Sequence, residues 1–196
     1  MSTQALAACQ RKMRDAQVSE AAITVFTHQY LQLEQGETGL IPEDSISPLL
    51  DPPMLDDVQV DADVATEALG ATVVIKLNGG LGTSMGLDRA KTLLPVRDGR
   101  TFLDLIVAQV SAARRRHGVR LPLLLMNSFR TEKDTLDALA PYPDLAVDGL
   151  PLGFGQNAEP KLLASDLTPV SWPADPSLEW CPPGHGDLYT ALLGTG

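Results

Sequence analysis

The sequence contains little cysteine and little positive charge. It has only 2 cysteines among 196 residues, and Cys9 and Cys181 lie far apart, outside any CxxC pattern. This spacing predicts reduced thiols rather than a disulfide framework, as in cytoplasmic proteins. The formal net charge is −10, which argues against broad binding to nucleic acid or to anionic membranes. A nucleotide ligand is still possible, because a phosphate pocket needs only local donors.

Long apolar runs are also missing. The most apolar stretches, ATVVI and LPLLLM, are far too short to span a bilayer, and the first 16 residues lack the apolar core of a signal peptide. We therefore expect a soluble, cytoplasmic protein with no membrane partner. Neither internal repeats nor low-complexity segments stand out beyond two proline-rich patches.

With 44% hydrophobic and 20% charged residues, the composition is typical of a globular protein, and the length of 196 residues fits one domain plus an appendage. Residues 3–35 have apolar positions at helical spacing with no internal proline or glycine, which predicts one continuous helix. Residues 40–68 hold four prolines and predict a connector with short helical pieces. Residues 1–68 are therefore predicted to be an N-terminal helical segment and linker.

Residues 69–196 have a different pattern, in which short β-branched or leucine-rich runs alternate with helical segments. Thr101 and Thr131 are expected to cap the two helices, and Gly118 to end the first. Alternation of this kind predicts an α/β fold with a mostly parallel sheet and helices on both faces, with ligands at the carboxyl ends of the strands. The predicted strand, helix, strand, helix and strand occupy residues 71–77 (buried), 101–117, 121–127, 132–140 and part of 145–155.

A glycine-rich loop, LNGGLGTSMG, follows the first predicted strand directly at residues 77–86. It matches neither the Walker pattern nor the GxGxxG dinucleotide fingerprint. Its glycines allow tight turning and close backbone approach to a ligand, and successive N–H groups can point at one phosphate oxygen. Thr83 and Ser84 would add hydroxyl donors, and Lys91 a positive charge. A glycine-rich turn without any ligand is the alternative interpretation.

Four sequence blocks occur in a fixed order and together cover about residues 71–193. They are KLNGGLGTSMG with Lys91 and TFLDLIVAQV, MNSFRTEKDT, Gln156 with Pro160, and PPGHGDLYTAL. In this order they resemble the eukaryotic type of the UTP–glucose-1-phosphate uridylyltransferase (UDP-glucose pyrophosphorylase) family, so the resemblance is specific. The related N-acetylhexosamine pyrophosphorylases have Arg-Leu in their glycine loop where this chain has Ser84 and Met85.

The resemblance implies a Rossmann-like nucleotidyltransferase fold, a Mg²⁺ requirement, and UTP and glucose 1-phosphate as substrates. It also implies that Lys91 contacts phosphate and favours transfer, that Gln156 and backbone near Gly184 contact the uracil edge, and that His185 faces the sugar phosphate. The loop that wraps the nucleotide and its phosphates corresponds to Leu77, Asn78, Gly79 and Gly80.

Each of these residues also has an ordinary structural interpretation. Gln156 could be an exposed loop glutamine, and Met126 at a strand end is more often core packing than a platform for a base. Asp187 is interpreted as the N-cap of the helix that follows it, rather than as a catalytic acid. The run Arg114–Arg116 is interpreted as a solvated face at a helix C-terminus, where positive charge is favoured.

The chain also departs from the family pattern. Arg89-Ala90 precede the lysine where the family usually has Gly-Pro, and Thr92 replaces a common serine. The family continues after the position of Gly196 with an aspartate that helps to hold Mg²⁺, a second lysine, most of the sugar pocket and a β-rich domain. We therefore expect a front portion, truncated at its C-terminus, that is inactive or nearly so alone and prone to self-association.

Three functional interpretations stay open at this point. The chain could be a portion of a uridylyltransferase whose full activity needs a longer product. It could be a non-catalytic nucleotide-binding fragment of such an enzyme. It could also be an interaction module in which the N-terminal helix docks a partner.

Overall fold

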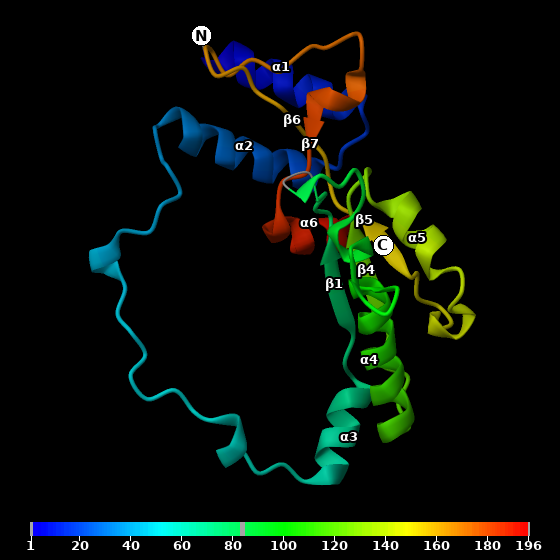
Figure 1. Cartoon of the computed structure of the whole chain (residues 1–196). Coiled ribbons are helices and arrows are strands. Elements are labelled where there is room, and N and C mark those ends of the chain that lie inside the picture. Colours follow the sequence, from blue (N-terminus) through cyan, green and yellow to red (C-terminus); the bar gives the residue numbers. More distant parts are fainter. Residues whose placement is uncertain (1, 83–84, 196) are drawn as a thin grey trace.

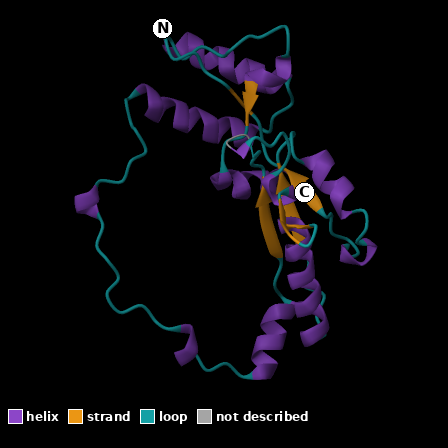
Figure 2. Cartoon of the chain, in the orientation of Figure 1, coloured by secondary structure: helices purple, strands orange, loops and turns teal. Residues whose placement is uncertain are grey.

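The computed structural model describes residues 2–82 and 85–195 (Figure 1). Short helices and strands alternate along most of this chain, and one long linker runs in a wide arc away from the rest (Figures 1 and 2). The elements are α1 (Ser2–Asp15), α2 (Glu20–Glu34), η1 (Glu43–Ser45), η2 (Leu55–Asp57), α3 (Ala62–Gly70), β1 (Val74–Asn78), η4 (Lys91–Leu93), β2 (Pro95–Arg97), β3 (Arg100–Thr101), α4 (Phe102–His117), β4 (Leu123–Asn127), α5 (Glu132–Leu139), η5 (Pro143–Leu145), β5 (Gly153–Gly155), β6 (Glu159–Pro160), η6 (Pro176–Glu179), β7 (Trp180–Cys181), η7 (His185–Asp187) and α6 (Leu188–Gly194).

The main sheet has the strand order β1-β4-β5 within the described residues, and both pairings are parallel. All five residues of β4 are buried, because this strand has a neighbour on each side and helices over each face. Leu123 and Leu125 pack into a cluster with α4 and α5, whereas Leu124 and Met126 pack with Ala191 of α6. The alternation along β4 thus confirms the predicted α/β fold with helices on both faces.

The first predicted strand differs in its burial. β1 lies at the edge of the sheet, so Val74, Ile75, Lys76 and Leu77 are only partly buried and Asn78 alone is buried. The strand predicted over residues 71–77 is present as β1, but the prediction that it is buried was wrong. Its β-branched residues favour a strand, but this preference does not reveal whether the strand is central in the sheet or at its edge.

Helix α4 begins and ends as its sequence predicts. The Thr101 hydroxyl accepts a hydrogen bond from Asp104 N (3.2 Å), and the Asp104 carboxylate accepts one from Thr101 N (2.7 Å). Tyr142 also donates to that carboxylate, and this hydrogen bond is the main cause that lowers the pKa of Asp104. Gly118 ends the helix in the left-handed conformation, with φ of 65°.

Helix α5 is capped differently from the prediction. Thr131 precedes α5, but its hydroxyl makes no capping bond to the helix. It accepts instead from Ser128 N at 3.0 Å, within the turn that leaves β4. A threonine at the right position in the sequence is therefore not sufficient, because the side chain can bond to the preceding turn instead.

The single helix predicted over residues 3–35 is in fact two helices that form a hairpin. The chain turns between them at Gln17, which has a φ of 60°, and the Ser19 hydroxyl caps α2 by accepting from Ala22 N. The turn brings Cys9 and Phe26 into one apolar cluster, which continues onto residues between 162 and 180. With no glycine or proline at the turn, the Ser19 cap was the only local signal of the break.

The N-terminal hairpin packs on residues much later in the chain. The Lys12 ammonium group pairs with the Glu179 carboxylate and donates to Val170 O at 2.6 Å. Helix α2 also lies against α6. The hairpin is therefore placed beside the C-terminal part of the described chain.

The linker between α2 and α3 matches the predicted connector with short helical pieces. Its apolar side chains are largely exposed, with Leu40, Leu50 and Leu55 at 80%, 82% and 84%. These exposed apolar side chains make the linker a candidate contact surface.

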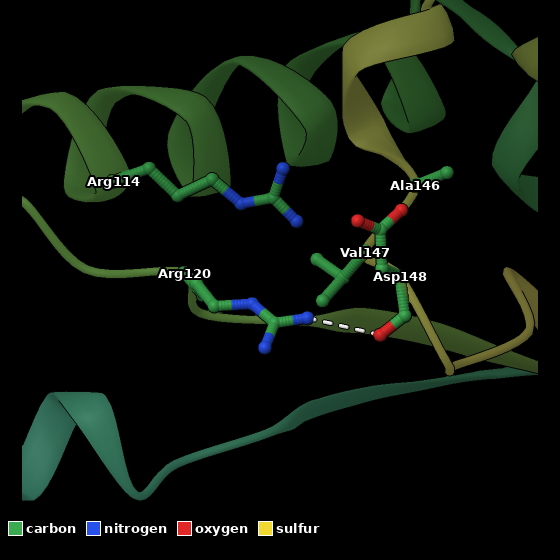
Figure 3. Close-up of a pocket in the computed structure, with 5 residues that line it drawn as sticks. All are labelled: Arg114, Arg120, Ala146, Val147 and Asp148. Carbon is green, nitrogen blue, oxygen red and sulfur yellow. Dashed lines mark hydrogen bonds between the residues drawn. The ribbon is translucent and has the colours of Figure 1, made fainter.

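A cavity of about 380 Å³ lies at the amino end of the sheet, lined by Arg114, Arg120 and Asp148 (Figure 3). Arg120 donates to Asp148 O at 3.0 Å, shown as a dashed line. Arg114 donates to the carbonyl oxygens of Leu121, Asp144 and Leu145. The interpretation of Arg114 as a solvated residue was thus wrong, because its guanidinium group holds three loop carbonyls together, whereas Arg115 and Arg116 are exposed as predicted.

Candidate functional site

The glycine-rich loop leaves the carboxyl end of β1 and returns to it at Lys91. Lys91 N donates to Gly80 O at 3.2 Å, and Gly82 N donates to Arg89 O at 3.2 Å, so the two arms of the loop are bonded to each other. Gly86 has a φ of 71°, which favours glycine. The predicted donors Thr83 and Ser84 lie outside the described residues. The loop thus brings Lys91 next to Gly80, although the two are distant in sequence.

Three more of the predicted residues meet at one point. The Gln156 side chain is buried between Gly79 and Gly184, and its Nε2 donates to Gly184 O at 2.6 Å. A Cβ atom added at Gly79 would collide with Gln156 Oε1. Gln156 N also donates to Asn127 O at the end of β4. Gln156 is therefore a fixed residue at the carboxyl edge of the sheet, and not an exposed loop glutamine.

The hydrogen bonds of Gln156 leave a specific capacity for a ligand. An amide has two N–H donors and one carbonyl oxygen. One donor is used by Gly184 O, and Gln156 Oε1 has no hydrogen-bond donor among the residues that the structure describes. The remaining donor and acceptor form the complementary pair that an imide edge such as that of uracil requires.

Of two further residues considered for the site, His185 lies on the surface and Met126 in the core. Gly184 has a φ of 106°, and the exposed His185 follows it at the start of η7. Met126 is fully buried in the apolar cluster of β4, which confirms its interpretation as core packing.

Asn78 uses its side chain inside the protein. Its Nδ2 donates to Asn127 Oδ1 (2.7 Å) and to Thr135 Oγ1 (2.8 Å), while its Oδ1 accepts from Thr92 Oγ1 (2.5 Å). Both N–H donors are thus used, which leaves the backbone of Asn78, rather than its side chain, for any contact with a nucleotide. Leu77, before it, packs partly buried beside the β4 cluster.

Asp187 occupies the N-cap position of α6, as predicted, but its side chain does not cap the helix. Its carboxylate makes no cap bond to α6 and accepts instead from Asn157 N (2.7 Å) and Asn157 Nδ2 (2.8 Å). Asp187 thereby joins the loop after β5 to the turn that contains Gly184 and His185. Neither Asn157 nor its neighbour Glu159 was singled out in the sequence, because loop residues that pair across 30 positions leave no periodic signal.

Glu159 lies partly buried beside this contact. Burial raises its pKa from 4.5 to about 7, and the nearby negative charge of Asp187 adds to the shift. Lys161 and Cys181 are the other ionisable groups close by, and the pKa of the Cys181 thiol is also raised, first by burial and then by Glu159. The folded state therefore favours the protonated form of Glu159.

Replacing Glu159 with glutamine is expected to change the pH dependence of stability. Because the folded-state pKa is raised, the wild-type free energy of unfolding should fall as pH rises from about 4.5 to about 7. The E159Q variant should match wild type at pH 4.5 and exceed it by roughly 1–3 kcal/mol at pH 8, after allowance for partial solvent exposure. Urea unfolding at both pH values checks this, and a difference that is equal at both would contradict it.

The described residues offer no obvious metal site. Within residues 2–82 and 85–195, no group of three or more His, Cys, Asp or Glu side chains is arranged to hold a metal ion. In the same part of the chain, no helix is long and apolar enough to cross a membrane.

A parallel sheet with helices on both faces, and a glycine loop at the carboxyl end of its first strand, defines a Rossmann-like α/β nucleotidyltransferase fold. The sequence matches the UTP–glucose-1-phosphate uridylyltransferase family over residues 23–196, and the chain belongs to that family.

Two named relatives and two solved structures agree with this assignment. The chain is 39% identical to the enzyme of that name from Solanum tuberosum over 80% of its own length, and 41% identical to a probable one from Schizosaccharomyces pombe over 70%. A UDP-glucose pyrophosphorylase variant from Leishmania major, in complex with UDP-glucose, has 46% identity and a TM-score of 0.89 over 98% of this chain. A UDP-glucose phosphorylase from Trypanosoma brucei has 42% identity and a TM-score of 0.81 over the same share.

The coverage of these proteins is partial. The chain spans 31% and 28% of the two named relatives, and 40% of each solved chain. Similarity over such a share does not by itself assign the activity of the whole relatives to this chain.

Proposed function

We propose that this chain provides the UTP-binding part of a uridylyltransferase that forms UDP-glucose and pyrophosphate from UTP and glucose 1-phosphate. The observation that supports this most is the convergence of Gly79, Gln156 and Gly184 at the carboxyl edge of the sheet, with Lys91 bonded through its backbone to Gly80. The Leishmania relative with UDP-glucose bound supports the choice of nucleotide and sugar.

In the proposed reaction, a phosphate oxygen of glucose 1-phosphate attacks the α-phosphorus of UTP in line. A new P–O bond forms at the α-phosphorus while the bond breaks between the α-phosphorus and the oxygen that bridges it to the β-phosphate. Pyrophosphate leaves with the electron pair of the broken bond. No covalent enzyme intermediate is needed, so the protein contributes positioning and neutralisation of charge.

The predicted site residues other than Leu77 and Asn78 each have a role in this proposal. The loop amides at Gly79 and Gly80 and the Lys91 ammonium group neutralise the triphosphate. The free donor and acceptor of Gln156 bind the uracil edge, with backbone near Gly184 beside it. His185, exposed after Gly184, faces the phosphate of the sugar substrate.

Mg²⁺ dependence is also proposed, from the charge of the triphosphate. The described residues contain no group of three or more His, Cys, Asp or Glu side chains arranged to hold the ion. The two free thiols fit a reducing compartment, and on that ground we propose a cytoplasmic location.

We further propose that the chain self-associates through its exposed apolar linker, in which Leu40, Leu50 and Leu55 lie largely in solvent. Sedimentation velocity at two protein concentrations would test this, and replacing Leu40, Leu50 and Leu55 with serine should then reduce association. A monomer at every concentration would contradict the proposal.

A non-catalytic nucleotide-binding fragment is the second candidate, favoured by the share of about a third of each named relative that the chain covers. Calorimetric titration with UTP and a pyrophosphate-release assay with glucose 1-phosphate separate the two. Binding together with release supports the enzyme, and binding alone supports the fragment. Absence of UTP binding would contradict both.

A further inference from the structure

A buried polar network lies directly beneath the proposed phosphate loop. It consists of Thr92, Asn78, Asn127 and Thr135, which are 7%, 3%, 0% and 0% exposed. Thr92 Oγ1 donates to Asn78 Oδ1, and Asn78 Nδ2 donates to both Asn127 Oδ1 and Thr135 Oγ1. These four residues belong to the Lys91 turn, β1, β4 and α5, so the network joins four segments that are distant in sequence.

The central residue of the network has no spare donor. Both N–H groups of Asn78 are used, and Thr135 Oγ1 donates onward to Thr131 O, just before α5, at 2.6 Å. In a buried site a satisfied hydrogen bond is strengthened by the low dielectric, and a group that loses its partner is costly. Thr92 is the member of this network that belongs to the turn of Lys91.

Thr92 and Lys91 are adjacent but differ in burial. Thr92 is buried against Asn78, whereas Lys91 is exposed and its ammonium group forms no ion pair with any described residue. The backbone of the same turn is hydrogen-bonded to the glycine-rich loop, because Lys91 N donates to Gly80 O. The turn is thus fastened at two points, one in the backbone and one through the Thr92 hydroxyl.

We propose that Thr92 is a positioning residue, whose hydroxyl bond to buried Asn78 holds the Lys91 turn against Gly80 and so directs the lysine toward the phosphates of UTP. This proposal rests on the proposed function. The hydroxyl is the required group, so serine should replace threonine and valine should not. Valine keeps the shape of the side chain but leaves Asn78 Oδ1 without its donor.

The test uses the whole 196-residue chain and measures the dissociation constant of UTP by calorimetry. T92V is expected to weaken binding about tenfold, and T92S to stay within about threefold of wild type. In a K91A background, T92V should have no further effect, because Thr92 acts only through Lys91. An equal loss from T92V in both backgrounds, or no loss in wild type, would overturn the proposal.

Y30F is the matched control, since it removes a hydroxyl that is bonded to Leu167 O in the distant N-terminal hairpin. It should leave the affinity for UTP unchanged. If T92V does not fold, T92A replaces it.

Amide hydrogen exchange gives a second readout that needs no nucleotide. Exchange at Lys91 N should accelerate at least tenfold in T92A or T92V but not in T92S or Y30F. Unchanged exchange would overturn the positioning role even if UTP binds. Faster exchange in a chain that does not bind UTP would instead contradict the proposed function and leave the turn-fastening contact established.

Discussion

Replacing Lys91 with alanine is expected to weaken UTP binding by about 10- to 100-fold while the fold is retained. A charge-assisted contact to phosphate contributes about 1.5–3 kcal/mol, which corresponds to that change in the dissociation constant. The fold should tolerate the change because Lys91 is exposed and its ammonium group has no ion pair within the described chain. Calorimetric titration with UTP measures the affinity, and thermal unfolding checks the fold.

Lys133 supplies the matched control for this prediction. It is exposed on α5 and pairs only with Asp137 at 2.7 Å, so K133A removes the same charge at a distance from the loop. We expect K133A to bind UTP as wild type does. Equal weakening in both variants would mean that net charge, rather than a specific phosphate contact, sets the affinity.

Gly79→Ala is expected to have the other large effect, on stability and on nucleotide binding together. The added Cβ would collide with Gln156 Oε1, and Gln156 cannot withdraw without losing its bond to Gly184 O. We expect a loss of roughly 1–3 kcal/mol in the free energy of unfolding, from overpacking and the broken bond. UTP binding should weaken at least tenfold, because the amide that we propose to bind the uracil edge is displaced.

Two comparisons identify the cause of the Gly79 effect. Gly80→Ala should keep the wild-type stability, since no described atom lies within 4 Å of a Cβ at that position. In a Q156A background, G79A should cost almost nothing further, because the obstacle is gone. If G79A lowers the free energy of unfolding as much in the Q156A background as in wild type, strain in the loop backbone, and not contact with Gln156, would be the reason that residue 79 must be glycine.

The secondary structure could be predicted where local signals and packing agree. Helix α4 has a capping box at Thr101 and a left-handed glycine at Gly118, and β4 has an apolar run of the right length. The sequence failed where tertiary contacts decide. The turn at Gln17 exists because the two N-terminal helices bury Cys9 and Phe26 against each other, and β1 is partly exposed because it lies at a sheet edge.

The candidate site was predicted on a different basis. Four blocks in a fixed order indicated Lys91, Gln156, Gly184 and His185, which no periodicity would have singled out. What could not be predicted is how their neighbours are used. Asp187 binds Asn157 instead of capping α6, and the Asn78 side chain lies in a buried network, because such choices depend on partners 30 to 57 positions away in sequence.

The most direct measurement is an amide ¹H–¹⁵N NMR titration of the 196-residue chain with UTP. The account predicts saturable shifts at Gly79, Gly80, Lys91 and Gly184, and at the side-chain amide of Gln156, with smaller shifts from CTP. Shifts confined to the arginine-lined cavity around Arg114 and Arg120, at the opposite end of the sheet, would contradict it. So would the absence of any shift at millimolar UTP.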